Sequence, residues 1–159
     1  MHALLKLLQA DARATPETLA KQLNLTPELV TGMIRELEQK GIILGYTAIV
    51  DNDKADLETV QAVIEVKITP ERDGGFDRIA NRIARYPEVT SCCLMSGGYD
   101  LLVIIHGKTM KEVAMFVSEK LATVAGVLST ATHFMLKPYK EQGVLLVGEG
   151  AQERLSVTP

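Results

Sequence analysis

Apolar and polar residues near the N-terminus follow the spacing of two consecutive amphipathic helices. Within residues 15–44 the same helix-start signal, Thr-Pro-Glu, occurs at Thr15 and again at Thr26. Each threonine can accept a hydrogen bond from a free N–H of the first turn, and each proline sits where no N–H is needed. Each glutamate favours the positive end of the helix dipole. A short turn at Asn24 and Leu25 separates the apolar runs, so the pattern predicts a helix-turn-helix.

The apolar residues of both helices are expected on one buried face. They are Leu19, Ala20 and Leu23 in the first helix, and Leu29, Val30, Met33, Ile34 and Leu37 in the second. An amphipathic helix around residues 4–8 is expected to pack against these two helices and complete a three-helix core. Gly41 ends the last helix. Residues 42–50 have a strand pattern. We therefore predict a winged helix-turn-helix domain over residues 1–50, followed by a charged linker at 51–59.

Strict alternation of apolar and polar residues marks a half-buried strand at residues 60–68. The elements expected after it are a helix at 76–84, strands at 89–95 and 101–105 joined by a glycine hairpin, a helix opened by the capping box of Thr109 and Glu112, and a strand at 127–136. This order predicts a ferredoxin-like antiparallel sheet with both helices on one face, and hence an α+β fold. The second domain is assigned to residues 60–148, and a frayed polar tail to 149–159.

The strand Leu101–Ile105 is apolar at every position, yet the two helices can cover only one face of its sheet. A second copy of the chain, packed face to face in a symmetric dimer, would cover the other face. The alternative is a segment of the same chain, for which residues 144–147 are the apolar candidate. We favour self-association.

Composition narrows the class of protein. The chain has 159 residues, of which 47% are hydrophobic, so packed cores are expected. It contains no apolar run of about 18 residues and no signal-peptide pattern, which predicts a cytoplasmic protein outside the membrane.

Adjacent Cys92 and Cys93 point to opposite faces of a strand and are interpreted as reduced packing residues. His106 and His133 lack a third ligand at a fixed spacing, so neither a metal nor another cofactor is expected.

The sequence contains no P-loop, nucleophile elbow or triad-like grouping, and we predict no enzymatic activity and no catalytic residues. The net charge of −3 also bears on function, because nucleic-acid binders more often carry a basic excess. Residues 1–50 hold five basic and five acidic side chains, so this region is formally neutral. Its phosphate contacts must be few, and useful affinity for DNA would need several copies on one duplex.

Five sequence marks, in this order, resemble the Lrp/AsnC family of feast/famine transcription regulators. They are LAKQLNLTPELV, LEQKGIILGYTAIVD, YPEV, SGGYDLLV and GVLSTAT. The resemblance covers roughly residues 4–136. It implies a bacterial or archaeal regulator that binds double-stranded DNA, pairs through its ferredoxin-like domains, often assembles further into octamers, and responds to an amino acid or a related small metabolite.

The resemblance places DNA contacts on the exposed side of the second helix of the tandem pair. The candidate residues are Thr26, Thr31, Gly32, Arg35 and Lys40. Arg35 can fork onto guanine or hold a phosphate, and Thr26 can reach a phosphate while it caps the helix. In the alternative interpretation Arg35 is a solvated surface side chain paired with Glu38 or Gln39.

The chain departs from the family at two places. Members commonly have basic residues at the positions of Gly32, Met33 and Glu36, so sequence reading is expected to differ. Gly32 is either a slack position or a point where the helix and the DNA backbone come close. The usual aspartates before the first helix are also missing, which shortens that helix.

The residues that match the family's effector loop are Ser96, Gly97, Gly98, Tyr99 and Asp100, and Thr130 and Thr132 on the last strand are placed in the same cleft. The glycine N–H groups can receive a ligand carboxylate, and the Asp100 carboxylate can accept an ammonium. In the alternative interpretation the segment is a tight hairpin in which Asp100 bonds its own turn.

Two competing functions stay open. One is an enzyme similar to siroheme decarboxylase subunits, for which Arg72, Arg78, Arg82 and His106 are loose candidates. The other is a metabolite-sensing partner that joins other family members without itself binding DNA, an interpretation that the neutral N-terminal region favours.

Overall fold

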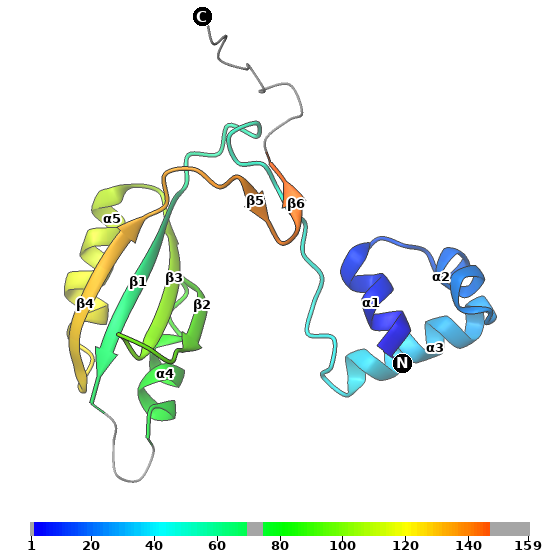
Figure 1. The fold of residues 1–159 in the computed structure, drawn as a ribbon, viewed down its shortest axis with the longest axis horizontal. Helices are drawn as coiled ribbons and strands as arrows, with labels where there is room; N and C mark the ends of the chain where they lie inside the picture. The colour runs from blue at the N-terminus through cyan, green and yellow to red at the C-terminus, as the bar shows by residue number, and fades with distance from the viewer. Residues whose placement is uncertain (1, 70–74, 147–159) are drawn as a thin grey trace, which may run out of the picture. The chain divides into compact units, whose positions relative to one another are not determined.

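The computed structural model describes residues 2–69 and 75–146 (Figure 1). The chain divides into two compact units, Met1–Ile49 and Val50–Pro159. We describe each unit by itself. Within the described ranges, no helix is long and apolar enough to cross a membrane.

The first unit consists of three helices whose ends follow the predicted signals. They are α1 (His2–Ala10), α2 (Pro16–Leu23) and α3 (Pro27–Gln39). Thr15 Oγ1 accepts a hydrogen bond from the Thr18 N–H at 3.3 Å, and Thr26 Oγ1 accepts one from the Leu29 N–H at 3.4 Å. Both predicted N-caps are therefore confirmed. The core consists of Leu4, Leu8, Leu19, Ala20, Val30 and Leu37.

Two expectations for this unit are wrong. Residues 42–50 form no strand, because a strand needs a hydrogen-bonded neighbour and the four-stranded and two-stranded sheets of the described chain do not include this segment. Leu29 is not buried with the other apolar residues of α3: its side chain is 57% exposed, whereas the neighbouring Val30 is fully buried. The helical repeat turns Leu29 about 100° away from Val30, off the packed face.

Alanine substitutions at two glycines of this unit should change its free energy of unfolding in opposite directions. Gly41 follows α3 with φ +64°, so Gly41→Ala should lower the free energy of unfolding by about 1–2 kcal/mol. Gly32 lies within α3, and a Cβ placed there meets no atom within 4 Å. Gly32→Ala should therefore raise that free energy by up to about 1 kcal/mol, through helix propensity alone. Denaturant unfolding of the two variants beside the parent chain tests this. Shifts of the same sign would contradict it.

The second unit is an antiparallel sheet with the strand order β2-β3-β1-β4. The strands are β1 (Val60–Ile68), β2 (Val89–Leu94), β3 (Leu101–Gly107) and β4 (Val127–Phe134), and the helices are α4 (Asp77–Ile83) and α5 (Met110–Met115). Both helices lie on one face of the sheet (Figure 1). The expected α+β, ferredoxin-like order is confirmed.

The helix expected after the capping box of Thr109 and Glu112 changes geometry halfway. Thr109 Oγ1 caps α5 by accepting from the Glu112 N–H at 3.1 Å, as predicted, and Glu112 Oε2 accepts from the Lys108 N–H at 2.8 Å. After Met115 the chain continues as the π-helical segment η1 (Phe116–Leu121). The wider turn ends with a hydrogen bond from the Ala122 N–H to the Val117 carbonyl at 2.8 Å.

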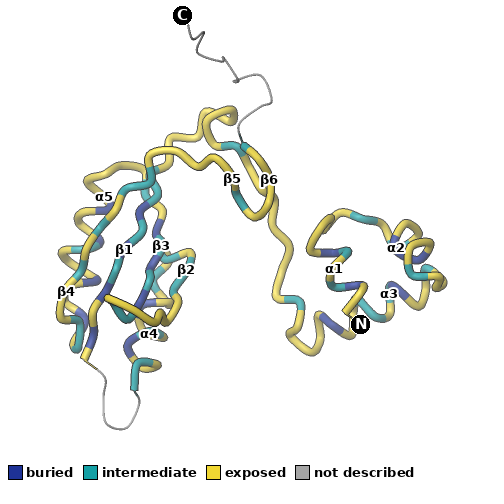
Figure 2. The backbone as a smooth tube through the Cα atoms, in the orientation of Figure 1, coloured by how far each residue is buried: buried dark blue, intermediate teal, exposed yellow. Residues whose placement is uncertain are grey.

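Along β1 and β3, buried residues alternate with less buried ones (Figure 2), so the two faces of the sheet differ in burial. On the face that α4 and α5 cover, Ile64 of β1 lies opposite Val103 of β3, and both are fully buried. On the helix-free face the side chains are only half-buried even at the centre, where Val63 lies opposite Ile104. The predicted strand at 60–68 and the predicted apolar surplus of β3 are both confirmed.

The same-chain segment proposed to cover β3 does not bury its own side chains. Val144 and Leu145 form β6 (Val144–Leu145), which pairs with β5 (Lys140–Glu141), and their side chains are 48% and 69% exposed. Val147 and the predicted polar tail at 149–159 lie outside the described residues. Cys92 is half-buried and its Sγ lies 3.8 Å from the Ala80 carbonyl oxygen, whereas Cys93 is exposed, so the opposite orientations predicted for the two thiols are confirmed.

Candidate functional site

The exposed face of α3 brings together Gly32 and Arg35, two of the predicted DNA-contact residues. Both are exposed, and within the described residues Arg35 takes part in no ion pair. The alternative pairing of Arg35 with Glu38 is not formed: Glu38 Oε1 instead accepts a hydrogen bond from the Tyr46 hydroxyl at 2.9 Å. Partial burial and, second, this hydrogen bond raise the pKa of Tyr46. Arg35 therefore keeps its guanidinium available to a ligand.

The charge at the end of α3 is largely compensated. Lys40 Nζ forms an ion pair with Glu36 one turn earlier. Hydrogen bonding to Lys40 lowers the pKa of Glu36, so this carboxylate is ionised at neutral pH. Because Glu36 already neutralises Lys40, this lysine offers a phosphate less attraction than a free cation would.

The two predicted threonines of α3 both bond to the helix itself. Thr31 is half-buried and its hydroxyl donates to the Pro27 carbonyl at 2.8 Å, while Thr26 caps the helix. Each hydroxyl still has a free donor or acceptor position. Arg35 is thus the strongest candidate for a direct contact among the predicted residues, and the threonines are secondary.

The glycine hairpin lies where β2 turns into β3. Ser96, Gly97 and Gly98 are exposed, and a Cβ placed at either glycine meets no atom within 4 Å, so their backbone is open to a small ligand. Tyr99 and Asp100 are half-buried.

Asp100 does more than bond its own turn, because it ties the hairpin to the end of β1. Asp100 Oδ2 accepts a hydrogen bond from the Ile68 N–H at 2.8 Å, and the Asp100 N–H donates to the Val66 carbonyl at 3.0 Å. The Asp100 carbonyl also accepts from the Met95 N–H across the hairpin at 2.8 Å. Within the described residues, one carboxylate oxygen therefore has a structural partner, and the other has none and is open to a ligand.

Thr130 and Thr132 do not lie beside the hairpin. They pair with Val66 and Ile64, so their half-buried side chains are on the helix-covered face. Strand β1 separates β4 from β3, which places the threonines two strand spacings, about 10 Å, from the strand that begins directly after Asp100. Within one chain the predicted effector residues are therefore brought together only in part.

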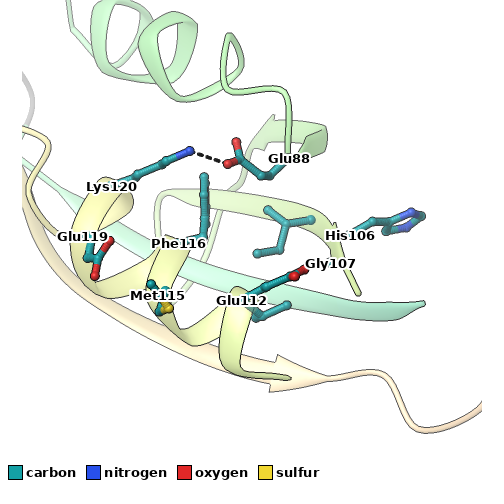
Figure 3. A pocket seen from close by; sticks show the side chains of 10 residues that line it. Glu88, His106, Gly107, Glu112, Met115, Phe116, Glu119 and Lys120 are labelled. Carbon is teal, nitrogen blue, oxygen red and sulfur yellow. Dashed lines mark hydrogen bonds and ion pairs between the residues drawn. The ribbon is translucent and has the colours of Figure 1, made fainter. Parts of the chain in front are cut away.

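A pocket of about 270 Å³ lies at the end of β3 away from the hairpin (Figure 3), and the buried residues Ile105, Val113 and Phe116 are part of its lining. At its rim, the Lys120 ammonium forms an ion pair with the Glu88 carboxylate. The same ammonium lies 6.0 Å from the centroid of the Phe116 ring. Hydrogen bonding from Lys120 lowers the pKa of Glu88. This ion pair connects η1 to the start of β2, while the second carboxylate oxygen, Glu88 Oε2, is buried and has no hydrogen-bond partner within the described residues.

Two features were not predicted from the sequence: the exposure of Leu29 on α3, and the ion pair between Glu88 and Lys120. The signal for Leu29 was its angular position, because it lies off the stripe formed by Val30 and Leu37. No local signal exists for the ion pair, whose members are 32 positions apart.

Comparison with known proteins links both units to one family. Residues 61–145 match the Lrp/AsnC ligand binding domain, and residues 2–43 match a winged helix-turn-helix DNA-binding domain. The chain is 45% identical over 157 residues to YugG, an uncharacterized HTH-type transcriptional regulator of Bacillus subtilis, with 98% of this chain and 95% of YugG covered. The chain belongs to the Lrp/AsnC family. The resemblance predicted from its sequence marks is confirmed.

Other proteins are similar to this chain over most of its length. HTH-type transcriptional regulator FL11 of Pyrococcus horikoshii is 30% identical over 138 residues, covering 87% of this chain and 88% of FL11. Among solved structures, regulator NMB0573 of Neisseria meningitidis, in complex with L-methionine, matches with a TM-score of 0.68 at 29% identity, covering 87% of this chain and 89% of that one. This Lrp/AsnC protein is accordingly a transcriptional regulator with a DNA-binding unit and a ligand-binding unit.

Proposed function

We propose that this Lrp/AsnC protein binds double-stranded DNA through α3 as a homo-oligomer, and that an amino acid or a related small metabolite bound at the hairpin adjusts this binding. The observation that carries the proposal is the capped helix α3, which presents Arg35 with no ion pair within the described residues. The ligand-binding unit and the L-methionine complex of the related Neisseria regulator support the effector class.

Removal of Arg35 should weaken DNA binding directly. Arg35→Ala is expected to cost about 1–3 kcal/mol in binding free energy if the guanidinium forks onto a base, since a bidentate contact carries that much discrimination. Electrophoretic mobility shifts with DNA from the gene's own promoter region measure the loss. Arg85→Ala removes the same charge from an exposed site in the second unit and serves as the control. Equal affinities for the Arg35 and Arg85 variants would contradict the assignment.

Self-association is proposed through the helix-free face of the sheet. Its apolar centre is formed by Val63, Leu102 and Ile104, which are half-buried within a single chain. Polar groups surround this centre, among them Glu65, whose carboxylate lies 3.5 Å from His133. An apolar patch with a polar rim is the usual anatomy of a protein interface, and a symmetric dimer would cover it. Pairing places at least two α3 helices on one DNA, which compensates for the neutral first unit.

The effector is proposed to bind through the open backbone of Gly97 and Gly98 and the second carboxylate oxygen of Asp100. Since Thr130 and Thr132 lie across β1, they reach such a ligand only if the site is completed by another subunit. A thermal-shift screen over the amino acids tests the effector class. A ligand at 100 times its dissociation constant should add about 2.7 kcal/mol of stability.

A second candidate function is a partner protein that senses metabolites and joins other family members. The equal number of acidic and basic residues in residues 1–50, together with the Glu36–Lys40 pair, favours it. The mobility-shift experiment separates the two functions, because only the first produces a specific complex between this chain and DNA.

A further inference from the structure

The exposed leucine at the start of α3 is not part of the apolar core that the described residues of its unit form. Leu29 is 57% exposed and lies outside the apolar cluster of that unit, although its N–H is held by the Thr26 cap. An exposed leucine in the first turn of the second helix occupies the position from which recognition helices contact base edges. The apolar side chain at this position is therefore available for contact with an apolar group of a base.

Leu29 and Arg35 lie on either side of Gly32, at three residues before and three after it. The helical repeat puts all three on the exposed half of α3, and a side chain at Gly32 would meet only open space. The glycine therefore leaves a notch between a leucine and an arginine. A DNA duplex can approach the helix backbone closely at this notch and contact both flanking side chains.

We propose that Leu29 is a specificity-determining residue that contacts the C5-methyl group of thymine in the major groove. A leucine side chain has no hydrogen-bond donor or acceptor, and the thymine methyl is the apolar feature that the major groove offers. Leu29 and Arg35 are six positions apart, which corresponds to about 9 Å along the helix axis, or two to three base-pair steps. The preferred half-site thus places a thymine about two to three base pairs from the guanine read by Arg35.

This inference rests on the proposed DNA binding and is tested separately from it. The preferred sequence is first selected from randomised duplexes with the full chain. Each thymine is then replaced by uracil, which removes only the methyl group. We expect one position per half-site at which uracil weakens binding by about fourfold, the effect of one buried methyl group.

Leu29→Ala should bind the thymine and uracil duplexes equally well, because the contact that distinguishes them is gone. Leu25→Ala is the matched control: Leu25 is also an exposed leucine, 40% exposed, but it lies in the turn before α3. The control should keep the thymine preference of the parent chain. Circular dichroism verifies that both variants are folded.

Two results would overturn the inference: uracil is tolerated at every position, or Leu29→Ala keeps the parent's preference for thymine. If the selection enriches no sequence at all, the proposed DNA binding fails and the inference fails with it. If a sequence is enriched but is indifferent to uracil, only the role of Leu29 is rejected.

Discussion

Ile104→Lys is expected to separate the oligomer into folded monomers. Ile104 lies on the helix-free face, at the centre of the proposed interface, and is only half-buried in the single chain. A lysine there can keep its ammonium in water in the monomer but would lose hydration in the oligomer. The loss of a central apolar contact and the added charge should weaken association by about 2–4 kcal/mol, or roughly 30-fold to 1000-fold. Sedimentation velocity over a range of concentrations measures this shift.

The same substitution at the adjacent residue, Val103, should have a different effect. Val103 is fully buried on the helix-covered face, so Val103→Lys should prevent the second unit from folding rather than dissociate it. Ala114→Lys adds the same charge to the exposed side of α5 and should leave the oligomer intact. A parent chain that sediments as a monomer at micromolar concentration, or an Ile104 variant that associates like the parent, would rule out this interface.

The elements that could be predicted from the sequence are those fixed by local or periodic signals. The caps at Thr15 and Thr26 depend on groups only three residues away, and the alternation at 60–68 follows directly from one covered face. The π-helical segment η1 could not be predicted, since the apolar spacing of residues 113–121 suits a regular helix as well. The pattern at 42–50 is typical of a strand, but a strand also needs a partner, which the pattern does not supply.

In the candidate sites, too, local signals predict some features, whereas others depend on residues distant in the sequence. Arg35 could form an ion pair with Glu38, three residues away, but Glu38 instead accepts a hydrogen bond from Tyr46. Tyr46 lies eight residues beyond Glu38, so this hydrogen bond could not be predicted from the helix alone. Asp100 and Ile68 are 32 positions apart, and no sequence motif announces their hydrogen bond. The sequence indicated that Asp100 is a functional residue. It did not indicate that one of its carboxylate oxygens accepts a hydrogen bond from β1, because that contact depends on how distant strands pair.

Asp100→Asn is expected to remove effector binding while preserving the hairpin. The asparagine side-chain oxygen can still accept the hydrogen bond from the Ile68 N–H, now 2.8 Å from Asp100 Oδ2, so the link to β1 survives. The negative charge that would hold a ligand ammonium is lost, which should weaken binding by about 1.5–3 kcal/mol, or roughly tenfold to 150-fold. The ligand-induced thermal shift should then largely disappear at ligand concentrations that saturate the parent chain.

Asp100→Ala tests the structural role that the asparagine variant spares. It leaves the N–H of Ile68, a residue only 3% exposed, without its partner and should lower the free energy of unfolding by about 1–3 kcal/mol. Asp53→Asn removes the same charge from an exposed linker position and should change neither quantity. If Asp100→Asn keeps the parent's ligand affinity while Asp100→Ala is destabilised, Asp100 serves only to fasten the hairpin to β1, and the ligand ammonium must be held elsewhere.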